Sequence, residues 1–153
     1  MMNGELVGTN MSISKMAVLG AGQMGNGITQ VAACAGIEVV MIDIKQEFVD
    51  RGIATIEKSL AKLVSKERMS QDDADSARAR ISTSTDRSVC SNVDLVVEAV
   101  PEILELKISI FAELDGICKP DCILASNTSS ISINTIAEST NRPDKVIGMH
   151  FMN

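Results

Sequence analysis

The feature that most constrains this chain is a glycine loop between a short apolar run and a helical pattern. Residues 15–20 read KMAVLG, and Gly20, Gly22 and Gly25 form a G-x-G-x-x-G pattern that opens a segment of small and apolar residues ending at Gly36. A second run, EVVMID, ends at Asp43. Strand, glycine turn, helix and strand within about thirty residues predict a βαβ unit, which requires parallel strands.

The rest of the chain continues the alternation of strands and helices. Apolar residues at spacings of three and four predict a long helix after Asp43 and another after Pro101, which ends the strand before it. A polar helix is expected over 70–80 and a short helix over 131–140, and strands are expected over 81–86, 94–100, 122–126 and 145–150. We therefore expect the α/β class, with a doubly wound, mostly parallel sheet of the Rossmann type.

Composition narrows the class of partner. The chain has 153 residues, of which 45% are hydrophobic and only 2% aromatic, so aliphatic side chains and Met must build the core. The formal charge of -6 disfavours nucleic acid and anionic membrane surfaces, because neither is attracted by an acidic protein. A small-molecule ligand is the natural expectation.

The cysteines and the first residues carry weaker expectations. Cys34, Cys90, Cys118 and Cys122 form no CxxC pair and the chain has one His, so we predict no metal site and reduced, buried thiols in a cytoplasmic protein. Residues 1–13 are expected to be a loose tail, since they lack the basic and apolar regions of a signal peptide. No apolar stretch approaches the roughly 18 to 20 residues of a membrane span.

Each glycine of the loop has a physical role if the loop binds a dinucleotide. Gly20 would make the tight turn, Gly22 would let the backbone approach a pyrophosphate, and Gly25 would let the helix pack closely on the strand. Gly27 is expected to keep the next turn of the helix narrow, because it has no side chain. Asp43, eighteen residues after Gly25, would accept hydrogen bonds from ribose hydroxyls and repel a 2′-phosphate, which predicts NAD rather than NADP. Three glycines alone could be only a turn, but the strand and helix around them favour nucleotide binding.

His150 is the only histidine and follows the last predicted strand. Imidazole titrates near neutral pH and could take the proton of a secondary alcohol as its hydride leaves. A hydrogen-bonded core histidine is the alternative, and the position leaves both readings open. Residues 126–130 (SNTSS) follow another strand, so their side chains could orient a substrate oxygen or could cap the next helix.

Four segments in register resemble a known family. GAGQMGNGI, DLVVEAVPE, ASNTSSI and GMHFMN, at their observed spacings, are similar to the N-terminal domain of 3-hydroxyacyl-CoA dehydrogenases, a family that includes 3-hydroxybutyryl-CoA dehydrogenases. The similarity extends from Ser14 to Asn153. It implies interconversion of (S)-3-hydroxyacyl-CoA and 3-oxoacyl-CoA with NAD as the cofactor.

The resemblance also implies roles for individual residues. His150 matches the family's catalytic base, and Ser129 matches a residue near the reacting oxygen, the substrate and the nicotinamide. Ser59 and Lys66 match contacts with the CoA part of the substrate, although a solvated basic stripe is an alternative reading of that helix. Cofactor contacts are implied for Gly20, Ala21, Gly22, Gln23, Met24, Gly25, Asp43, Glu102, Lys107, Ser129 and Asn153, with Glu98 as a weaker candidate.

The sequence departs from the family pattern in two respects. Met152 stands where the family has an aromatic residue. The family pairs its His with a Glu roughly a dozen residues downstream and has a helical C-terminal domain for substrate binding and dimerisation, and neither lies within residues 14–153. We therefore expect an incomplete NAD-binding domain that is a poor catalyst alone, belonging to an enzyme that is a homodimer when complete.

Two other functions share part of this sequence pattern. A stand-alone NAD-binding module without chemistry would leave the retention of His150, Ser129 and the CoA-facing residues unexplained. A hydroxyisobutyrate-type dehydrogenase shares the GxGxMG start, but it would place a Lys base on a later helix. SNTSSI followed by GMHF speaks against that class.

Overall fold

The computed structural model describes residues 12–151 and contains one six-stranded sheet. All neighbouring strands are parallel, and their order across the sheet is β3-β2-β1-β4-β5-β6. The strands are β1 (Lys15–Leu19), β2 (Glu38–Ile42), β3 (Ile81–Ser84), β4 (Leu95–Glu98), β5 (Ile123–Ser126) and β6 (Val146–Gly148). The chain thus adds strands on one side of β1 and then on the other, which is the doubly wound order expected for a dinucleotide-binding sheet.

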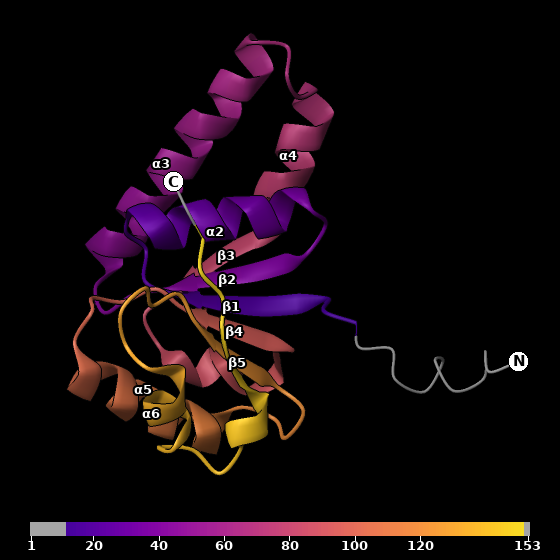
Figure 1. Cartoon of the computed structure of the whole chain (residues 1–153). Helices are drawn as coiled ribbons and strands as arrows, with labels where there is room; N and C mark the ends of the chain where they lie inside the picture. The colour runs from indigo at the N-terminus through magenta and orange to yellow at the C-terminus, as the bar shows by residue number, and fades with distance from the viewer. Residues whose placement is uncertain (1–11, 152–153) are drawn as a thin grey trace, which may run out of the picture.

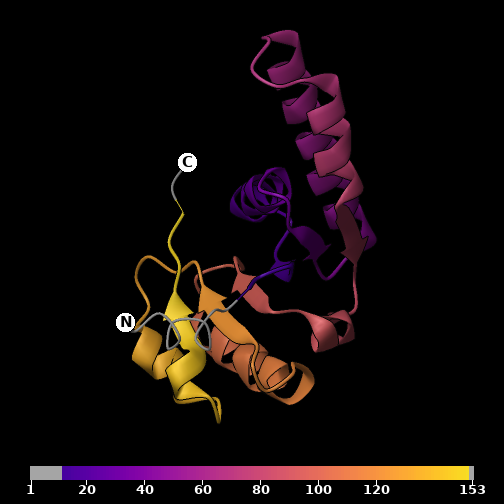
Figure 2. The same cartoon turned by 90° about the vertical axis from the view of Figure 1, so that its right-hand side faces the viewer.

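Helices cover both faces of this sheet, as Figures 1 and 2 show. The helices are α2 (Gln23–Cys34), α3 (Gln46–Ser65), α4 (Gln71–Ala79), α5 (Leu104–Ile117) and α6 (Ile133–Ala137), with short 3-10 helices η1 (Arg87–Asn92) and η2 (Pro143–Lys145). One core lies between the sheet and α2, α3 and α4, and a second lies between the sheet and α5, α6 and η1. Side chains alternate between these cores along β1, β2, β4 and β5, so these central strands are buried on both faces.

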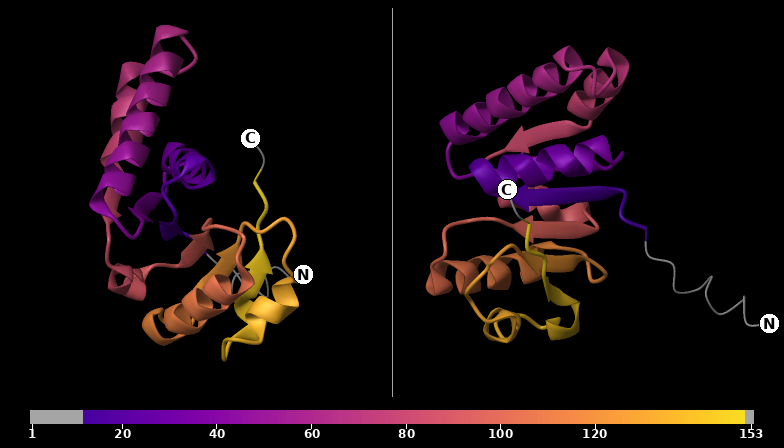
Figure 3. Two further views of the ribbon diagram at one scale, coloured as in Figure 1. Left: turned by 90° about the vertical axis from the view of Figure 1, so that its left-hand side faces the viewer. Right: turned by 45° about the horizontal axis from the view of Figure 1, so that its top comes forward.

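Helices α3 and α4 form a hairpin that projects beyond α2 (Figure 3). Ser70 caps α4 by accepting a hydrogen bond from the Asp73 amide, and an ion pair joins Arg78 to Glu57 across the hairpin. Glu67, at the turn between the two helices, has a left-handed backbone with φ 59°. The polar helix α4 thus packs against the long helix α3.

A buried arginine, which the sequence did not single out, holds the end of α5. The Arg142 guanidinium donates to the Asp115 carboxylate and to the carbonyls of Asp115, Cys118, Lys119 and Cys122. The carbonyls at a helix C-terminus lack partners within the helix, and a cation also matches the negative end of its dipole. Arg142 therefore joins the end of α5, the segment that leads into β5 and the segment before η2.

Several expectations need correction. Cys34 is exposed, whereas Cys90, Cys118 and Cys122 are buried and free as expected. The helix expected over 131–140 is shorter, because Ser132 caps it and it begins at Ile133. All the strands except β5 end earlier than expected, so His150 lies two residues beyond β6. Ile13, which the sequence placed in the tail, packs against the α2-side core. No helix within residues 12–151 is long and apolar enough to cross a bilayer.

Candidate functional site

The site lies where the sheet changes winding direction, between β1 and β4. The two strands pair in register from Met16 with Leu95 to Leu19 with Glu98. The connections that leave them, to α2 and to α5, diverge to opposite faces of the sheet. Ligands of open α/β sheets bind in the crevice that such a switch point creates at the carboxyl ends of the strands.

The glycine loop packs tightly at this crevice. Two of its glycines have no room for a side chain. Gly20 has φ +108°, and a Cβ there would lie 2.5 Å from the Ala99 carbonyl oxygen at the end of β4. A Cβ on Gly25 would lie 1.7 Å from the Gly20 carbonyl oxygen. The roles predicted for these two residues, a tight turn and close packing of helix on strand, are confirmed.

Gly22 differs, because nothing lies within 4 Å of a Cβ placed on it. It is the exposed N-cap of α2, where the structure shows no side-chain cap and no acidic residue in the first turn. The first turn of this helix therefore offers amides and a positive dipole without an acidic side chain of its own, and Gly22 leaves room beside it. These are the conditions in which a helix N-terminus binds phosphate.

Asp43 follows β2 and already has a structural role. Its Oδ2 accepts a hydrogen bond of 2.8 Å from the Ala21 amide, and its Oδ1 accepts one of 2.7 Å from the Ile44 amide. The first bond ties the glycine loop to the end of β2. Asp43 thus positions the loop as well as offering a carboxylate at the place expected for a ribose.

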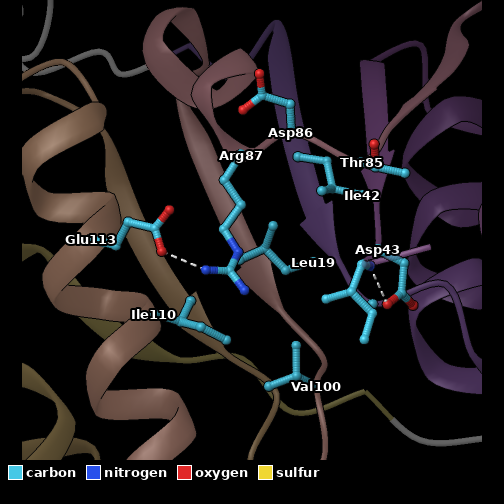
Figure 4. A pocket seen from close by; sticks show the side chains of 11 residues that line it. Leu19, Ile42, Asp43, Thr85, Asp86, Arg87, Val100, Ile110 and Glu113 are labelled. Atoms are coloured by element: carbon cyan, nitrogen blue, oxygen red, sulfur yellow. Dashed lines mark hydrogen bonds and ion pairs between the residues drawn. The ribbon is translucent and has the colours of Figure 1, made fainter. Parts of the chain in front are cut away.

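A cleft of about 360 Å³ opens beside Asp43, and we call it the Asp43 cleft (Figure 4). Apolar side chains of Leu19, Ile42 and Ile110 line it, and Arg87 extends across it from η1 to an ion pair with Glu113 on α5. The sequence did not single out Arg87 or Glu113. Only the position of Arg87 after the β3 strand, at the same sheet edge, could have indicated it.

A second cleft, of about 470 Å³, lies on the other side of the glycine loop, and we call it the His150 cleft. It brings together residues from α2, the β4–α5 turn, α5, the β5–α6 loop and the segment after β6. These residues are Met24, Ala99, Val100, Pro101, Glu102, Lys107, Asn127, Ser129, His150 and Phe151. Five of the residues implied by the resemblance meet here. His150 is exposed to solvent, so the alternative of a core histidine is wrong.

Backbone hydrogen bonds hold His150 at the edge of the sheet. The Met149 amide donates to the Ser126 carbonyl, and the Phe151 amide donates to the Asn127 side chain at 2.8 Å. The segment on either side of the imidazole is therefore fixed to the end of β5. A fixed backbone limits the positions that the imidazole can take over the cleft.

Under the cleft lies a buried ionic network. The Lys107 ammonium is 1% exposed and contacts the Glu98 carboxylate at 2.5 Å and the Glu102 carboxylate at 3.0 Å, and it donates to the Val100 carbonyl. Burial would raise the pKa of Glu102, but hydrogen bonds from Thr128, Ser130 and Lys107 outweigh it and lower the pKa to about 2. Glu102 is thus ionised at neutral pH.

The polar residues at the end of β5 and directly after it have different hydrogen-bond partners. Ser126 is buried and donates to Glu98, while Thr128 and Ser130 donate to Glu102. Ser132 caps α6. Ser129 is exposed and lines the His150 cleft, so it is the serine with its side chain available to a ligand there.

Two implied residues lie elsewhere. Ser59 accepts a hydrogen bond from Gln30 on α2, and Lys66 is the exposed C-cap of α3. Neither belongs to the two clefts, so the structure does not unite them with His150. Asn153 lies outside the described residues. No group of three potential metal-binding side chains occurs within residues 12–151.

Comparison with known proteins decides the family. The profile of the family described as "3-hydroxyacyl-CoA dehydrogenase, NAD binding domain" matches residues 15–153. The chain belongs to the 3-hydroxyacyl-CoA dehydrogenase family. It contains that family's NAD-binding domain, and the open α2 terminus, the space at Gly22 and the Asp43 carboxylate fit the cofactor.

Relatives within the family include enzymes from several bacteria. A probable 3-hydroxybutyryl-CoA dehydrogenase of Deinococcus radiodurans is 51% identical over 139 residues, which is 91% of this chain and 50% of the relative. The crystal structure of (S)-3-hydroxybutyryl-CoA dehydrogenase from Ralstonia eutropha has a TM-score of 0.90 at 46% identity, over 93% of this chain and 50% of that one.

The structure of 3-hydroxybutyryl-CoA dehydrogenase from Escherichia coli has a TM-score of 0.92 at 38% identity, over 94% of this chain and 30% of that one. The chain spans about half the length of curated 3-hydroxybutyryl-CoA dehydrogenases that it matches.

Proposed function

We propose that this chain provides the cofactor site and the general base for oxidation of (S)-3-hydroxyacyl-CoA to 3-oxoacyl-CoA, or for the reverse reaction. The observation that carries the proposal is the His150 cleft, in which His150, Ser129, Glu102 and Lys107 meet beside the glycine loop. The runner-up, an NAD-binding module without chemistry, gives no reason for an exposed imidazole at this edge.

The dinucleotide would extend from one cleft to the other. Its adenosine would lie in the Asp43 cleft, with the ribose hydroxyls donating to Asp43, and its pyrophosphate would lie on the amides at the start of α2. Gly20, Ala21, Gly22, Gln23, Met24 and Gly25 would form the floor of the phosphate site. The nicotinamide would then reach the His150 cleft, between Met24 and the β4–α5 turn.

His150 would remove the hydroxyl proton of the substrate. When bound there, NAD accepts the hydride that leaves C3, and the C3–O bond becomes a carbonyl. The imidazole takes the hydroxyl proton as that hydride departs, and it returns the proton in the reverse direction. Ser129 would donate a hydrogen bond to the reacting oxygen and hold it beside the imidazole.

The CoA part of the substrate would contact the α3–α4 hairpin. Ser59 and Lys66 lie on this projecting element, and a lysine ammonium suits the phosphates of CoA. Asn153 would contact the cofactor just beyond His150. These contacts remain predictions, as do a homodimer and a cytoplasmic location for the complete protein. The free cysteines agree with a reducing compartment.

The test is NADH oxidation with acetoacetyl-CoA by this chain and by the same chain joined to the C-terminal half of the Deinococcus relative. We expect turnover mainly from the longer protein. Exchange of His150 for Gln should abolish this turnover and leave NADH affinity nearly unchanged. Acetoacetate without CoA serves as the control substrate.

Each result has a defined meaning. Turnover of acetoacetate but not of its CoA thioester would exclude the proposed substrate class. Absence of turnover from both proteins, with NADH still bound, would favour the binding module. A large loss of NADH affinity on exchange of His150 would indicate a structural role for that residue.

A further inference from the structure

Glu98 is a fully buried carboxylate to which the proposed chemistry assigns no task. It ends β4 with 0% exposure, directly beneath the turn that carries Glu102. Its Oε2 accepts from the Val100 amide and the Lys107 ammonium, and its Oε1 accepts from the Ser126 hydroxyl at 2.5 Å. Every contact on this carboxylate is a donor, and one of them is the Lys107 ammonium.

Glu98, Lys107 and Glu102 together carry an excess of negative charge. The three N–H donors of the ammonium face Glu98, Glu102 and the Val100 carbonyl, so its single positive charge is shared between two carboxylates. Glu102 is ionised, since its pKa lies at about 2. The side chains that line the His150 cleft include no other lysine or arginine. The cluster therefore has a net charge of about -1.

The two redox forms of the cofactor respond differently to such a charge. The nicotinamide ring carries one positive charge when oxidised and none when reduced, whereas the rest of the dinucleotide is the same. We propose that Glu98 is a specificity-determining residue whose charge raises the affinity of the His150 cleft for the oxidised cofactor relative to the reduced one. This inference rests on the placement of the nicotinamide under the proposed function.

Hydrogen bonding alone does not require the charge. A glutamine at position 98 could keep its oxygen toward the Val100 amide and Lys107, and its amide group could donate to Ser126. The Ser126 hydroxyl already accepts from the Thr128 amide and has a second lone pair for this contact. Glutamine can therefore keep partners for the Val100 amide, Lys107 and the Ser126 oxygen while it removes the charge, and the Ser126 hydroxyl hydrogen must turn to another acceptor.

The experiment compares dissociation constants of NAD⁺ and NADH for the chain and for Glu98→Gln, measured by isothermal titration calorimetry at low salt. A unit charge acting over roughly 10 Å at an effective dielectric near 20 alters binding roughly tenfold. We expect Glu98→Gln to weaken NAD⁺ binding about that much relative to NADH binding, so the ratio of the two constants is the readout.

Two further variants make the result specific. Glu38→Gln removes the same charge at the amino end of β2, where Glu38 is exposed and pairs with Lys15, and the ratio should not change. Glu102→Gln neutralises the same cluster at a partly exposed position, so it should shift the ratio in the same direction even if Glu98→Gln fails to fold.

The outcomes separate this inference from the proposed function. Equal weakening of both redox forms by Glu98→Gln and Glu102→Gln, with the ratio within twofold of the unmodified chain, would overturn the inference and leave the cofactor placement standing. If the unmodified chain binds neither form, the placement itself fails and the inference fails with it.

Discussion

Gly25 is the position where a single methyl group should be most harmful. Its Cβ would lie 1.7 Å from the Gly20 carbonyl oxygen and 2.6 Å from the Gly20 carbonyl carbon, and both are backbone atoms. A Cβ atom essentially never comes closer than 3.0 Å to a heavy atom outside its own residue and its two chain neighbours. The start of α2 must therefore retreat from the end of β1 by somewhat more than 1 Å in Gly25→Ala.

The expected loss of stability follows from the contacts that this shift of α2 disturbs. Forcing extra volume into a packed site costs about 1–3 kcal/mol and occasionally more, and the shift also strains the bond from the Ala21 amide to Asp43. We expect Gly25→Ala to lower the free energy of unfolding by about 3 kcal/mol, which in a domain of this size is a fall of roughly 6–12 °C in melting temperature. Thermal melting followed by circular dichroism measures it.

Two neighbouring glycines are matched controls. A Cβ on Gly22 or on Gly27 meets nothing within 4 Å, so the expected need for a narrow turn at Gly27 is wrong. Gly27→Ala should raise stability by about 0.5–1 kcal/mol, because alanine has the higher helix propensity. Gly22→Ala should melt near the unmodified chain yet lose NADH affinity, since the methyl group occupies the expected pyrophosphate position.

The reasoning fails if Gly25→Ala melts within about 2 °C of the unmodified chain. It also fails if Gly22→Ala lowers the melting temperature as much as Gly25→Ala, because the packing role would then not be particular to the third glycine.

Three further predictions follow from named contacts. Asp43→Ala should weaken NADH binding roughly tenfold or more and relax discrimination against NADPH, because it removes a ribose partner and frees the glycine loop; unchanged affinity for both cofactors in titration would refute the ribose role. Arg142→Leu should destabilise the chain by about 3–5 kcal/mol in urea unfolding, because it leaves Asp115 and four carbonyls without their buried cation; a loss below 1 kcal/mol would contradict this. Hydrogen bonds from Lys119 and Ser14 lower the pKa of Asp94, so its stabilisation exists above the unfolded pKa near 4 and disappears as pH falls through the lower folded value. The Asp94→Asn variant should therefore differ from the unmodified chain by about 1–2 kcal/mol at pH 7 and by less at pH 3; an equal difference at both would exclude this linkage.

Local patterns predicted the parts of the fold that depend on near neighbours. Alternation of apolar runs with helical spacing indicated parallel strands, and the glycine loop with Asp43 indicated the nucleotide end of the site. Such signals act over a few residues or one βαβ unit, where turn chemistry and side-chain periodicity are decided. His150 could be placed at the sheet edge for the same reason, because it follows a strand.

Contacts between distant segments could not be read in this way. The ion pair of Arg87 with Glu113 and the attachment of Arg142 to Asp115 each join residues about 26 positions apart. They exist because right-handed crossovers return the chain to the same sheet edge or helix end. The sequence offers many charged residues, and no local rule selects these partners.

The SNTSS segment separates the two kinds of information. By itself the sequence determined that these residues follow a strand and must face the carboxyl edge of a parallel sheet. Only the tertiary structure decided that Ser126 is buried against Glu98, that Ser130 holds Glu102, and that Ser129 remains open to the His150 cleft. The physical reason is that a hydroxyl group takes whichever partner the fold brings within about 3 Å, and that partner here comes from another strand or turn.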